Sequence, residues 1–187
     1  MKDFPDLLIL RHGETEWNAT GRLQGSFDST LTPEGVAQAA RQRAILSRLD
    51  LTGYRAISSP QGRAFRTAAL ALDGLIDEIH TDDRLREIGL GTWAGRDRAE
   101  LMAETGAEDG FALYELAPGG EGFGALARRC EGFLADLTTP AIVVTHGITS
   151  RMLRLLLTGS APERLRDMGG GQGVVYRVSG GRQELLS

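Results

Sequence analysis

The chain has 187 residues, 41% of them hydrophobic and 25% charged, which is typical of one globular domain with a sizeable core. Its net charge of −4 argues against general nucleic-acid binding, which needs a basic face, and no apolar run approaches the ~20 residues that a membrane span requires. Lys2 is the only lysine, which excludes enzyme classes that depend on an internal lysine, such as P-loop nucleotide hydrolases, Schiff-base enzymes and protein kinases.

The N-terminal segment predicts a buried strand that ends on polar residues. MKDFPD contains no apolar stretch of a signal peptide, so we expect a cytoplasmic protein. Residues 7–10 are aliphatic without interruption, as in a strand buried on both faces. The run then stops at Arg11, His12 and Gly13.

The next elements alternate between helix and strand. Thr32 and Pro33 predict the start of a helix that runs to about Leu49. We expect its buried side to carry Val36, Ala40, Ala44 and Leu49. Residues 54–58 predict a second strand, and Pro60 opens a second helix. Its apolar residues recur at helical spacing, at Ala64, Ala68, Ala71 and Leu75.

The second half of the chain continues this alternation. A short strand and a glycine-rich loop lie within residues 79–95, and a helix is expected over 98–104. After the break at 118–120, an amphipathic helix has one apolar face made of Phe123, Leu126, Ala127, Cys130, Phe133, Leu134 and Leu137. We therefore interpret Cys130, the single cysteine, as a core thiol. A third buried strand follows over 141–145, then a helix with Met152, Leu153, Leu156 and Leu157, and then a closing strand pair over 174–178 and around Glu184.

This order predicts a three-layer α/β/α sandwich with a mainly parallel central sheet. Ligands of such sheets bind beyond the carboxyl ends of the strands. Two buried strands end in the same way there, one in Arg11-His12 and the other in His146-Gly147. We expect both strand ends to face one pocket.

The arginines near helix starts indicate an anionic ligand. Arg63 and Arg66 lie in the first turns of the helix after Pro60, and Arg151 lies early in the helix after His146. A cation at the positive end of a helix dipole is unfavourable by a few tenths to ~1 kcal/mol, and an anion removes the conflict. Helix N-termini and arginine forks both suit phosphate, so a phosphoryl ligand is expected.

A phosphoryl ligand gives the histidines a function. A neutral imidazole is a nucleophile, and nearby arginines disfavour its protonated form. A proton donor for the leaving oxygen is then needed, and Glu87 is the candidate because glycines and Trp93 around it predict close, partly apolar packing. Taken alone, a histidine at a strand end is more often a core residue, an arginine at a helix start is usually solvated, and a loop glutamate usually lies on the surface. Only the combination indicates a pocket.

The combination resembles the histidine phosphatase superfamily, also called the phosphoglycerate mutase-like family. RHGET at 11–15 with Asn18 matches its signature, and the segments RLQGSFDSTLTPEGVAQA, SSPQGRAFRTA, LREIGLGTWAG, GGEGF and VTHG follow in the family's order. The resemblance covers Leu7 to about Gln172 and implies a phosphoglycerate mutase-like fold. It also implies no metal and no cofactor.

The resemblance implies roles for individual residues. By position, His12 resembles the residue that becomes phosphorylated, and Glu87 resembles the proton donor. The phosphate pocket is implied for Arg11, Arg63 and His146. Residues that help to hold phosphate or substrate are implied at Asn18, Gln24 and Gly147. Arg151 matches a position where arginine is common, whereas Arg66 has no counterpart.

The implied activity is that of a metal-independent phosphomonoesterase acting on a small phosphorylated metabolite. The mutases of the family carry a longer insertion than the cap-like segment expected here at about 96–120. Gly122 and the later Gln172-Gly173 resemble α-ribazole phosphatases. Two alternatives are a cofactor-dependent phosphoglycerate mutase and a non-catalytic module that binds a phospho-ligand. A zinc hydrolase is disfavoured because no two histidines have a ligand spacing such as H-x-x-x-H.

Overall fold

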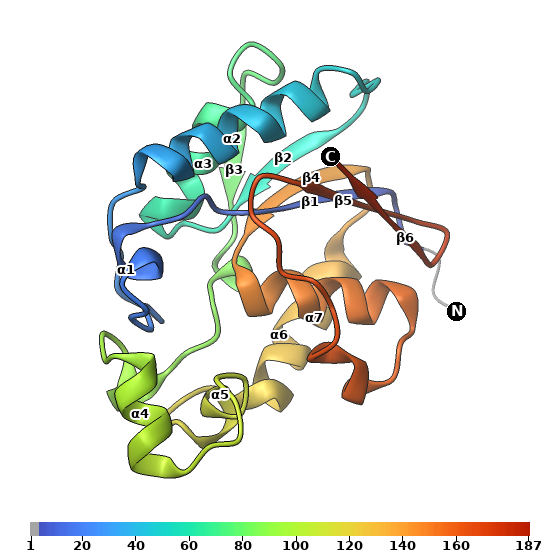
Figure 1. Ribbon diagram of the computed structural model, residues 1–187. Coiled ribbons are helices and arrows are strands. Elements are labelled where there is room, and N and C mark those ends of the chain that lie inside the picture. The colour runs from blue at the N-terminus through green and yellow to red at the C-terminus, as the bar shows by residue number, and fades with distance from the viewer. Residues whose placement is uncertain (1–3) are drawn as a thin grey trace.

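The computed structural model describes residues 4–187, in which a six-stranded sheet lies between two layers of helices (Figure 1). The strands are β1 (Leu7–Arg11), β2 (Arg55–Ser58), β3 (Ile79–Thr81), β4 (Ala141–Thr145), β5 (Val175–Ser179) and β6 (Arg182–Leu186). Their order in the sheet is β3-β2-β4-β1-β5-β6. The first four strands in this order are mutually parallel. β5 runs antiparallel to β1, and β6 runs antiparallel to β5. The predicted sandwich with a mainly parallel sheet is confirmed, as is the closing strand pair.

The two central strands are buried on both faces because helices cover both faces of the sheet. Leu7 and Ile9 of β1 belong to one hydrophobic cluster, whereas Leu8 and Leu10 belong to another. β4 divides its residues between the same two clusters. Successive side chains of a strand point to opposite faces, so an unbroken apolar run serves two cores.

The helices are α1 (Glu16–Ala19), α2 (Pro33–Leu46), α3 (Gly62–Ala71), α4 (Arg98–Thr105), α5 (Leu113–Leu116), α6 (Gly122–Asp136) and α7 (Gly147–Thr158). Short 3-10 turns span Asp83–Leu85, Gly91–Trp93 and Pro162–Leu165. α2 and α3 cover one face of the sheet, and α6 and α7 cover the other (Figure 1). None of these helices, within the described residues, has the length and apolar character of a membrane span.

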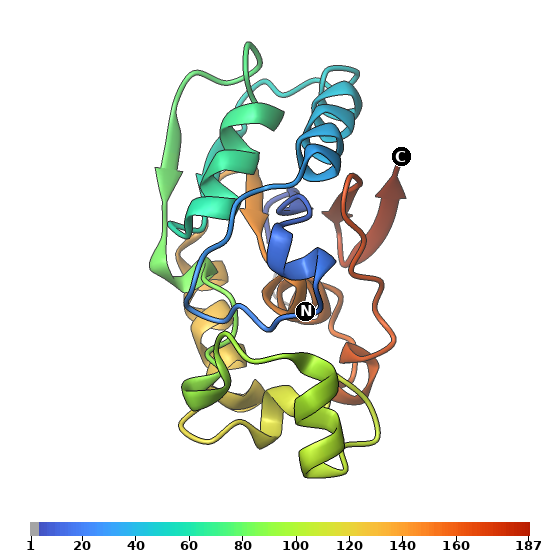
Figure 2. The same ribbon diagram turned by 60° about the vertical axis from the view of Figure 1, so that its left-hand side comes forward.

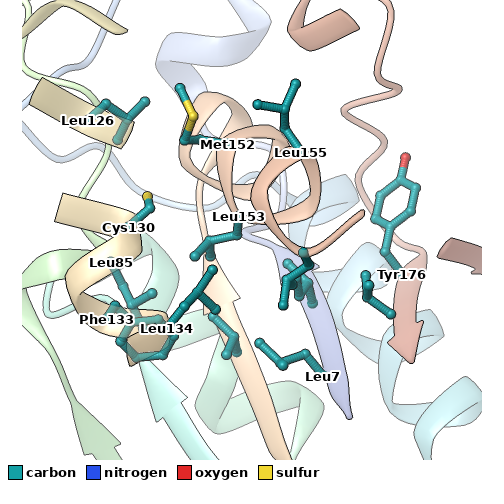
Figure 3. Close-up of a cluster of buried hydrophobic side chains, with 14 of the residues drawn as sticks. Leu7, Leu85, Leu126, Cys130, Phe133, Leu134, Met152, Leu153, Leu155 and Tyr176 are labelled. Atoms are coloured by element: carbon teal, nitrogen blue, oxygen red, sulfur yellow. The ribbon is translucent and has the colours of Figure 1, made fainter. Parts of the chain in front are cut away.

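The core beneath α6 and α7 confirms the predicted apolar face of α6 (Figure 3). Leu126, Cys130, Phe133 and Leu134 are all buried in it. Burial raises the pKa of the Cys130 thiol to about 12, so the thiol stays protonated at neutral pH. The interpretation of Cys130 as a core residue is confirmed.

The predicted buried side of α2 is wrong. Val36, Ala40 and Ala44 are exposed, and the residues that face the sheet include Gln38 and Gln42. Both glutamines bond to the backbone around the first strand end: the Gln38 side-chain oxygen accepts from Glu14 N at 2.7 Å, and Gln42 Nε2 donates to Arg11 O at 3.0 Å. Ala39, Ile45 and Leu46 are buried on the same face, and the two glutamines between them interrupt the apolar periodicity that would have revealed it.

Residues 96–120 lie beside the sandwich and not on the sheet (Figure 2). They contain α4 and α5, and they pack their own small cluster around Leu23, Leu90, Leu101 and Leu113. Trp93 packs against this cluster. We call residues 96–120 the cap.

Candidate active site

The carboxyl ends of β1 and β4 lie next to each other, as predicted. Arg11 is in register with Thr145, and the His12 N–H donates to the Thr145 carbonyl at 2.9 Å. After β1 the chain goes to α2 on one face of the sheet, whereas after β4 it enters α7 on the other face. Chains that leave neighbouring parallel strands in opposite directions leave a crevice between them.

A cavity of about 460 Å³ opens at this crevice, between the sandwich and the cap. Its wall contains most of the predicted site residues: Arg11, His12, Asn18, Gln24, Arg63, Glu87 and Gly147. The cap contributes Arg98, Asp109, Gly110, Phe111 and Tyr114. His146 is fully buried beside the wall, with its ring centroid 5.2 Å from that of His12.

The hydrogen bond of His12 fixes which of its ring nitrogens is free. Its Nδ1 lies 2.7 Å from the Gly13 carbonyl oxygen. A carbonyl only accepts, so Nδ1 carries the proton of the neutral ring and the lone pair is on Nε2. Burial lowers the pKa of His12 well below 6.5, and the charges of Arg11 and Arg63 lower it further. The ring is therefore neutral at pH 7.

His146 has one engaged and one unsatisfied ring nitrogen. Its Nε2 lies 2.8 Å from the hydroxyl of Ser59, whose oxygen accepts from Gln61 N at 3.3 Å. The Ser59 hydroxyl can donate to Nε2 or accept from it, and the ring proton lies on Nδ1 in the tautomer in which Ser59 donates. That Nδ1 is buried and has no partner within residues 4–187. Burial, reinforced by the charge of Arg63, lowers the pKa of His146 well below 6.5.

Arg11 and Arg63 are held by carbonyl and carboxylate oxygens at their tips. Arg11 Nη1 donates to Gly170 O at 2.7 Å. Arg63 donates through Nη1 to Asp28 Oδ1 at 2.8 Å and through Nη2 to Gly25 O at 3.1 Å. The Nε atoms of both arginines are buried and find no acceptor in the described part of the chain. Each unsatisfied buried donor lowers the stability of the fold by about 1–3 kcal/mol. A ligand oxygen that accepts from these atoms would remove that cost.

Glu87 faces the N-terminus of α7. Its Oε1 accepts from the backbone and hydroxyl of Thr149, both at 3.1 Å, and its Oε2 accepts from Ile148 N at 3.2 Å. We expected partly apolar packing around Glu87, with Trp93 beside it. The contacts of the carboxylate are instead polar, and Trp93 packs against the hydrophobic cluster of the cap.

The three predicted substrate-holding residues take different positions. Asn18 Oδ1 accepts from Thr15 N at 3.2 Å and closes a capping box on α1. Gln24 Nε2 donates to the Thr15 hydroxyl at 2.8 Å, and its Oε1 is buried without a partner among residues 4–187. Gly147 begins α7, where an added Cβ would lie 3.4 Å from Arg11 Cζ. Its missing side chain leaves the Arg11 guanidinium close to the helix backbone.

Gly13 serves the packing of the strand end. A Cβ at this position would lie 2.3 Å from the carbonyl oxygen of Gly35 in α2. We expect Gly13→Ala to lower the free energy of unfolding by about 1–3 kcal/mol, because backbone must move to admit the methyl group. Gly132→Ala, in the middle of α6 where an added Cβ meets nothing within 4 Å, should instead stabilise by about 0.5–1 kcal/mol. Urea denaturation of the two variants checks both signs.

The two buried histidines make stability depend on pH. Both stay neutral in the folded chain, whereas in the unfolded chain a histidine titrates near pH 6.5. Below that pH the unfolded state binds more protons, so stability falls as the pH drops from 7 to 5, by up to ~1.4 kcal/mol per pH unit for each histidine. Urea denaturation across this range should show the loss, and a double His12→Gln, His146→Gln variant should show a shallower one. Equal slopes in both proteins would contradict the burial argument.

Two site residues were not singled out from the sequence, although both lie in quoted segments. Asp28 accepts from Gly62 N at 2.6 Å and pairs with Arg63 at 2.8 Å, so it anchors the start of α3. The side-chain oxygen of Gln61 accepts from Glu87 N at 2.8 Å. Gln61 stands two positions before Arg63 in the sequence, whereas nothing local marks Asp28, which is 35 positions away from Arg63.

The coil between α7 and β5 also contributes to the site. Arg154 of α7 is fully buried and holds this coil by donating to Gly169 O at 2.5 Å, with its Cζ 3.8 Å from the ring centroid of Tyr176. From the same coil, Gln172 Nε2 donates to His12 O at 3.1 Å. The coil thereby links the core to the strand end that carries His12.

Two other residues lie away from the cavity. Arg66 is exposed on the outer side of α3, near Val36 of α2, so its prediction as a phosphate ligand is wrong. It follows Arg63 by three residues, but its side chain leaves the helix on the solvent side. His80, on the edge strand β3, lies 3.5 Å from Glu78.

The described residues contain no cluster of three or more His, Cys, Asp or Glu side chains that could hold a metal ion. The groups next to His12 are instead hydrogen-bond donors and the carboxylate of Glu87, which has donors around it. This set of groups fits an oxyanion.

Known proteins are similar to this chain in both sequence and fold. The probable phosphoglycerate mutase GpmB of Salmonella choleraesuis (strain SC-B67) is 35% identical over 175 residues, which are 84% of this chain and 78% of that protein. The structure of mycobacterial glucosyl-3-phosphoglycerate phosphatase in complex with VO3 has a TM-score of 0.83 and 31% identity, covering 97% of this chain and 96% of that chain. The α-ribazole phosphatase of Shigella flexneri has a TM-score of 0.82 and 28% identity, covering 97% and 95%.

These likenesses confirm the predicted phosphoglycerate mutase-like fold, and the two phosphatase structures support a phosphatase. The family model of the Histidine phosphatase superfamily (branch 1) matches residues 7–185. This match spans nearly the whole chain and includes both strand ends of the cavity. The chain belongs to the histidine phosphatase superfamily.

Proposed function

We propose that the chain is a metal-independent phosphomonoesterase that forms a phosphohistidine on His12 from a small phosphorylated metabolite. The observation that carries the proposal is the set of unsatisfied buried donors next to His12. Arg11 Nε, Arg63 Nε and His146 Nδ1 are buried, and residues 4–187 offer them no acceptor. The oxygens of a phosphoryl group would satisfy them, and the same contacts would stabilise the charge of the transition state.

In the first step, the lone pair of His12 Nε2 attacks phosphorus as the P–O bond to the leaving group breaks. The leaving oxygen takes a proton from the carboxyl group of Glu87, which becomes a carboxylate. In the second step, that carboxylate takes a proton from water as the water oxygen attacks phosphorus. The N–P bond breaks, inorganic phosphate leaves, and the lone pair returns to Nε2.

The position of Glu87 sets a condition on this mechanism. Both carboxyl oxygens accept hydrogen bonds at the start of α7, and the contact from Ile148 N to Oε2, at 3.2 Å, is the longest of them. A protonated carboxyl oxygen still has a lone pair for one N–H donor. The condition is therefore that the O–H of Glu87 points away from the α7 donors and toward the leaving oxygen.

The remaining residues act in binding under this proposal. Asn18 and Gln24 face the cavity beside the phosphoryl site, and Gly147 leaves room for Arg11. The side-chain amide of Gln24 can turn its NH2 group toward the ligand, since the Thr15 hydroxyl can donate as well as accept. Residues 1–187 would form one domain, with the cap shaping the entrance to its cavity.

The experiment is to trap the covalent intermediate. The protein is mixed with p-nitrophenyl phosphate in the presence and absence of EDTA, quenched in alkali and mapped by mass spectrometry. We expect p-nitrophenol release that EDTA does not change and a phosphate adduct on the peptide that contains His12. The chain has three histidines, so the map separates His12 from His80 and His146. Turnover that EDTA abolishes, or an adduct elsewhere, would overturn the mechanism.

The same experiment separates the enzyme from a non-catalytic binding module. A module of that kind would bind inorganic phosphate but release no p-nitrophenol and carry no adduct. Glu87 in the cavity wall argues against it, because anion binding alone has no use for a carboxylate there.

A mutase is the second candidate, and the likeness to the probable phosphoglycerate mutase GpmB favours it. A mutase moves the phosphoryl group between positions of one substrate and does not lose it to water. We expect 3-phosphoglycerate with 2,3-bisphosphoglycerate to give inorganic phosphate faster than 2-phosphoglycerate. α-Ribazole phosphate, suggested by Gly122 and Gln172, belongs in the same substrate panel.

A further inference from the structure

The cavity wall is far more basic than the chain as a whole. The chain has a net charge of −4, yet the wall contains six arginines and three carboxylates. The arginines are Arg11, Arg22, Arg63, Arg98, Arg151 and Arg166. One phosphoryl group at the strand ends accounts for Arg11 and Arg63 and leaves the others unexplained.

The three carboxylates of the wall offset only part of the surplus, and none of them pairs with Arg98 or Arg151. Asp109 lies 3.8 Å from Arg166, and Asp167 lies 3.5 Å from Arg164, which is outside the wall. Glu87 accepts from the N-terminus of α7. Arg98 and Arg151 form no ion pair within 4.0 Å with any carboxylate of residues 4–187.

Arg98 and Arg151 are held at the cap by aromatic rings. The Cζ of Arg151 lies 6.0 Å from the centroid of Phe111, and the Cζ of Arg98 lies 6.0 Å from that of Tyr114. Arg98 also donates to the Tyr114 hydroxyl at 3.2 Å. Ring contacts fix the direction of a guanidinium without neutralising it, so both charges are held in place and uncompensated.

Two further observations indicate that an anion is missing here. Arg151 Nε is buried and has no acceptor among the described residues. Burial lowers the pKa of Arg11, the charge of Glu87 raises it, and the charges of Arg151 and Arg98 lower it again, so one carboxylate lies within range of three cations. Like charges held close together are unfavourable unless an anion lies among them.

We infer that Arg98 and Arg151 form a second anion subsite, which binds an acidic group on the leaving part of the substrate. The substrate class is a phosphate ester that carries a further carboxylate or phosphate. The inference rests on the proposed function, since the leaving group is defined only if His12 takes the phosphoryl group. It disfavours α-ribazole phosphate, whose nucleoside part has no acidic group.

The test compares substrates that differ only in this acidic group. 3-Phosphoglycerate and glycerol 3-phosphate differ by a carboxylate in place of a hydroxymethyl group. Fructose 1,6-bisphosphate and fructose 6-phosphate differ by one phosphate and show which acid the subsite prefers. We expect the acidic member of at least one pair to have a kcat/KM about tenfold or more above its partner, since a charge-assisted contact is worth about 1.5–3 kcal/mol.

Arg98→Gln and Arg151→Gln should each bring that ratio toward one. Arg48→Gln, an exposed arginine at the end of α2 and far from the cavity wall, is the matched control and should keep the ratio. Ratios near one in the wild type, or equal losses on both substrates in Arg151→Gln, would overturn the subsite. Turnover of p-nitrophenyl phosphate by the wild type shows whether the proposed function stands, and without it both proposals fail.

Discussion

His12→Ala is expected to lower kcat for p-nitrophenyl phosphate by about four orders of magnitude, as loss of a covalent nucleophile does in other enzymes. Among the described residues, His12 is the histidine that lines the cavity. Its Nδ1 forms a hydrogen bond, and its Nε2 forms none with residues 4–187. His146 cannot replace His12, because its Nε2 is engaged by Ser59 and its fully buried ring lies behind the cavity wall. Steady-state p-nitrophenol release measures the loss.

Binding should survive in the same variant. Arg11, Arg63 and His146 keep their unsatisfied donors, so His12→Ala should still bind inorganic phosphate in a calorimetric titration. His80→Ala is the matched control, because His80 is exposed on β3 and lies outside the cavity wall. Activity of His12→Ala within tenfold of the wild type would contradict the assignment of the nucleophile.

Glu87→Gln is expected to lower kcat/KM for an alkyl phosphate by about 10²–10³-fold, the range of a lost general acid. The loss on p-nitrophenyl phosphate should be smaller, because p-nitrophenolate is a good leaving group and needs less help from a proton. An amide cannot donate a proton to the leaving oxygen as an acid does. Parallel assays of glycerol 3-phosphate and p-nitrophenyl phosphate measure the difference.

The geometry at Glu87 requires a control for folding. Both carboxylate oxygens of Glu87 accept from backbone N–H groups of α7, whereas a glutamine has only one oxygen. Its NH2 group would therefore face one of these N–H donors, and that contact would be repulsive. Thermal melts of Glu87→Gln should therefore be compared with those of Glu131→Gln, an exposed carboxylate on α6. Equal losses on the two substrates, whatever the stability, would count against Glu87 as the acid.

Local sequence patterns predicted the strands and most helix faces correctly. The aliphatic runs at 7–10 and 141–144 fall in β1 and β4, because a strand covered on both faces must be apolar throughout. The face of α6 was also correct, since its contacts are purely hydrophobic. α2 was wrong because its buried Gln38 and Gln42 bond to the backbone, and periodicity does not record polar partners.

Short motifs carried less information about the substrate than about the family. Gly122, one basis for the likeness to α-ribazole phosphatases, has φ of 68° at the start of α6. Glycine adopts this left-handed conformation without steric cost, whereas other residues are strained in it. The backbone therefore explains Gly122 without reference to the substrate.

The sequence by itself determined the family, the two strand ends and the residues that meet at them, because the order of apolar and polar residues along each strand is a local property. Only the tertiary structure decided how those residues act. The proton on His12 Nδ1 is set by the carbonyl of Gly13, and Glu87 is held by an α7 terminus far along the chain. The unpaired charges of Arg98 and Arg151 become visible only when the cap lies over the cavity. The Gly13 contact joins adjacent residues but depends on their backbone conformation, and the other two depend on the arrangement of distant segments; no pattern of residue types contains either.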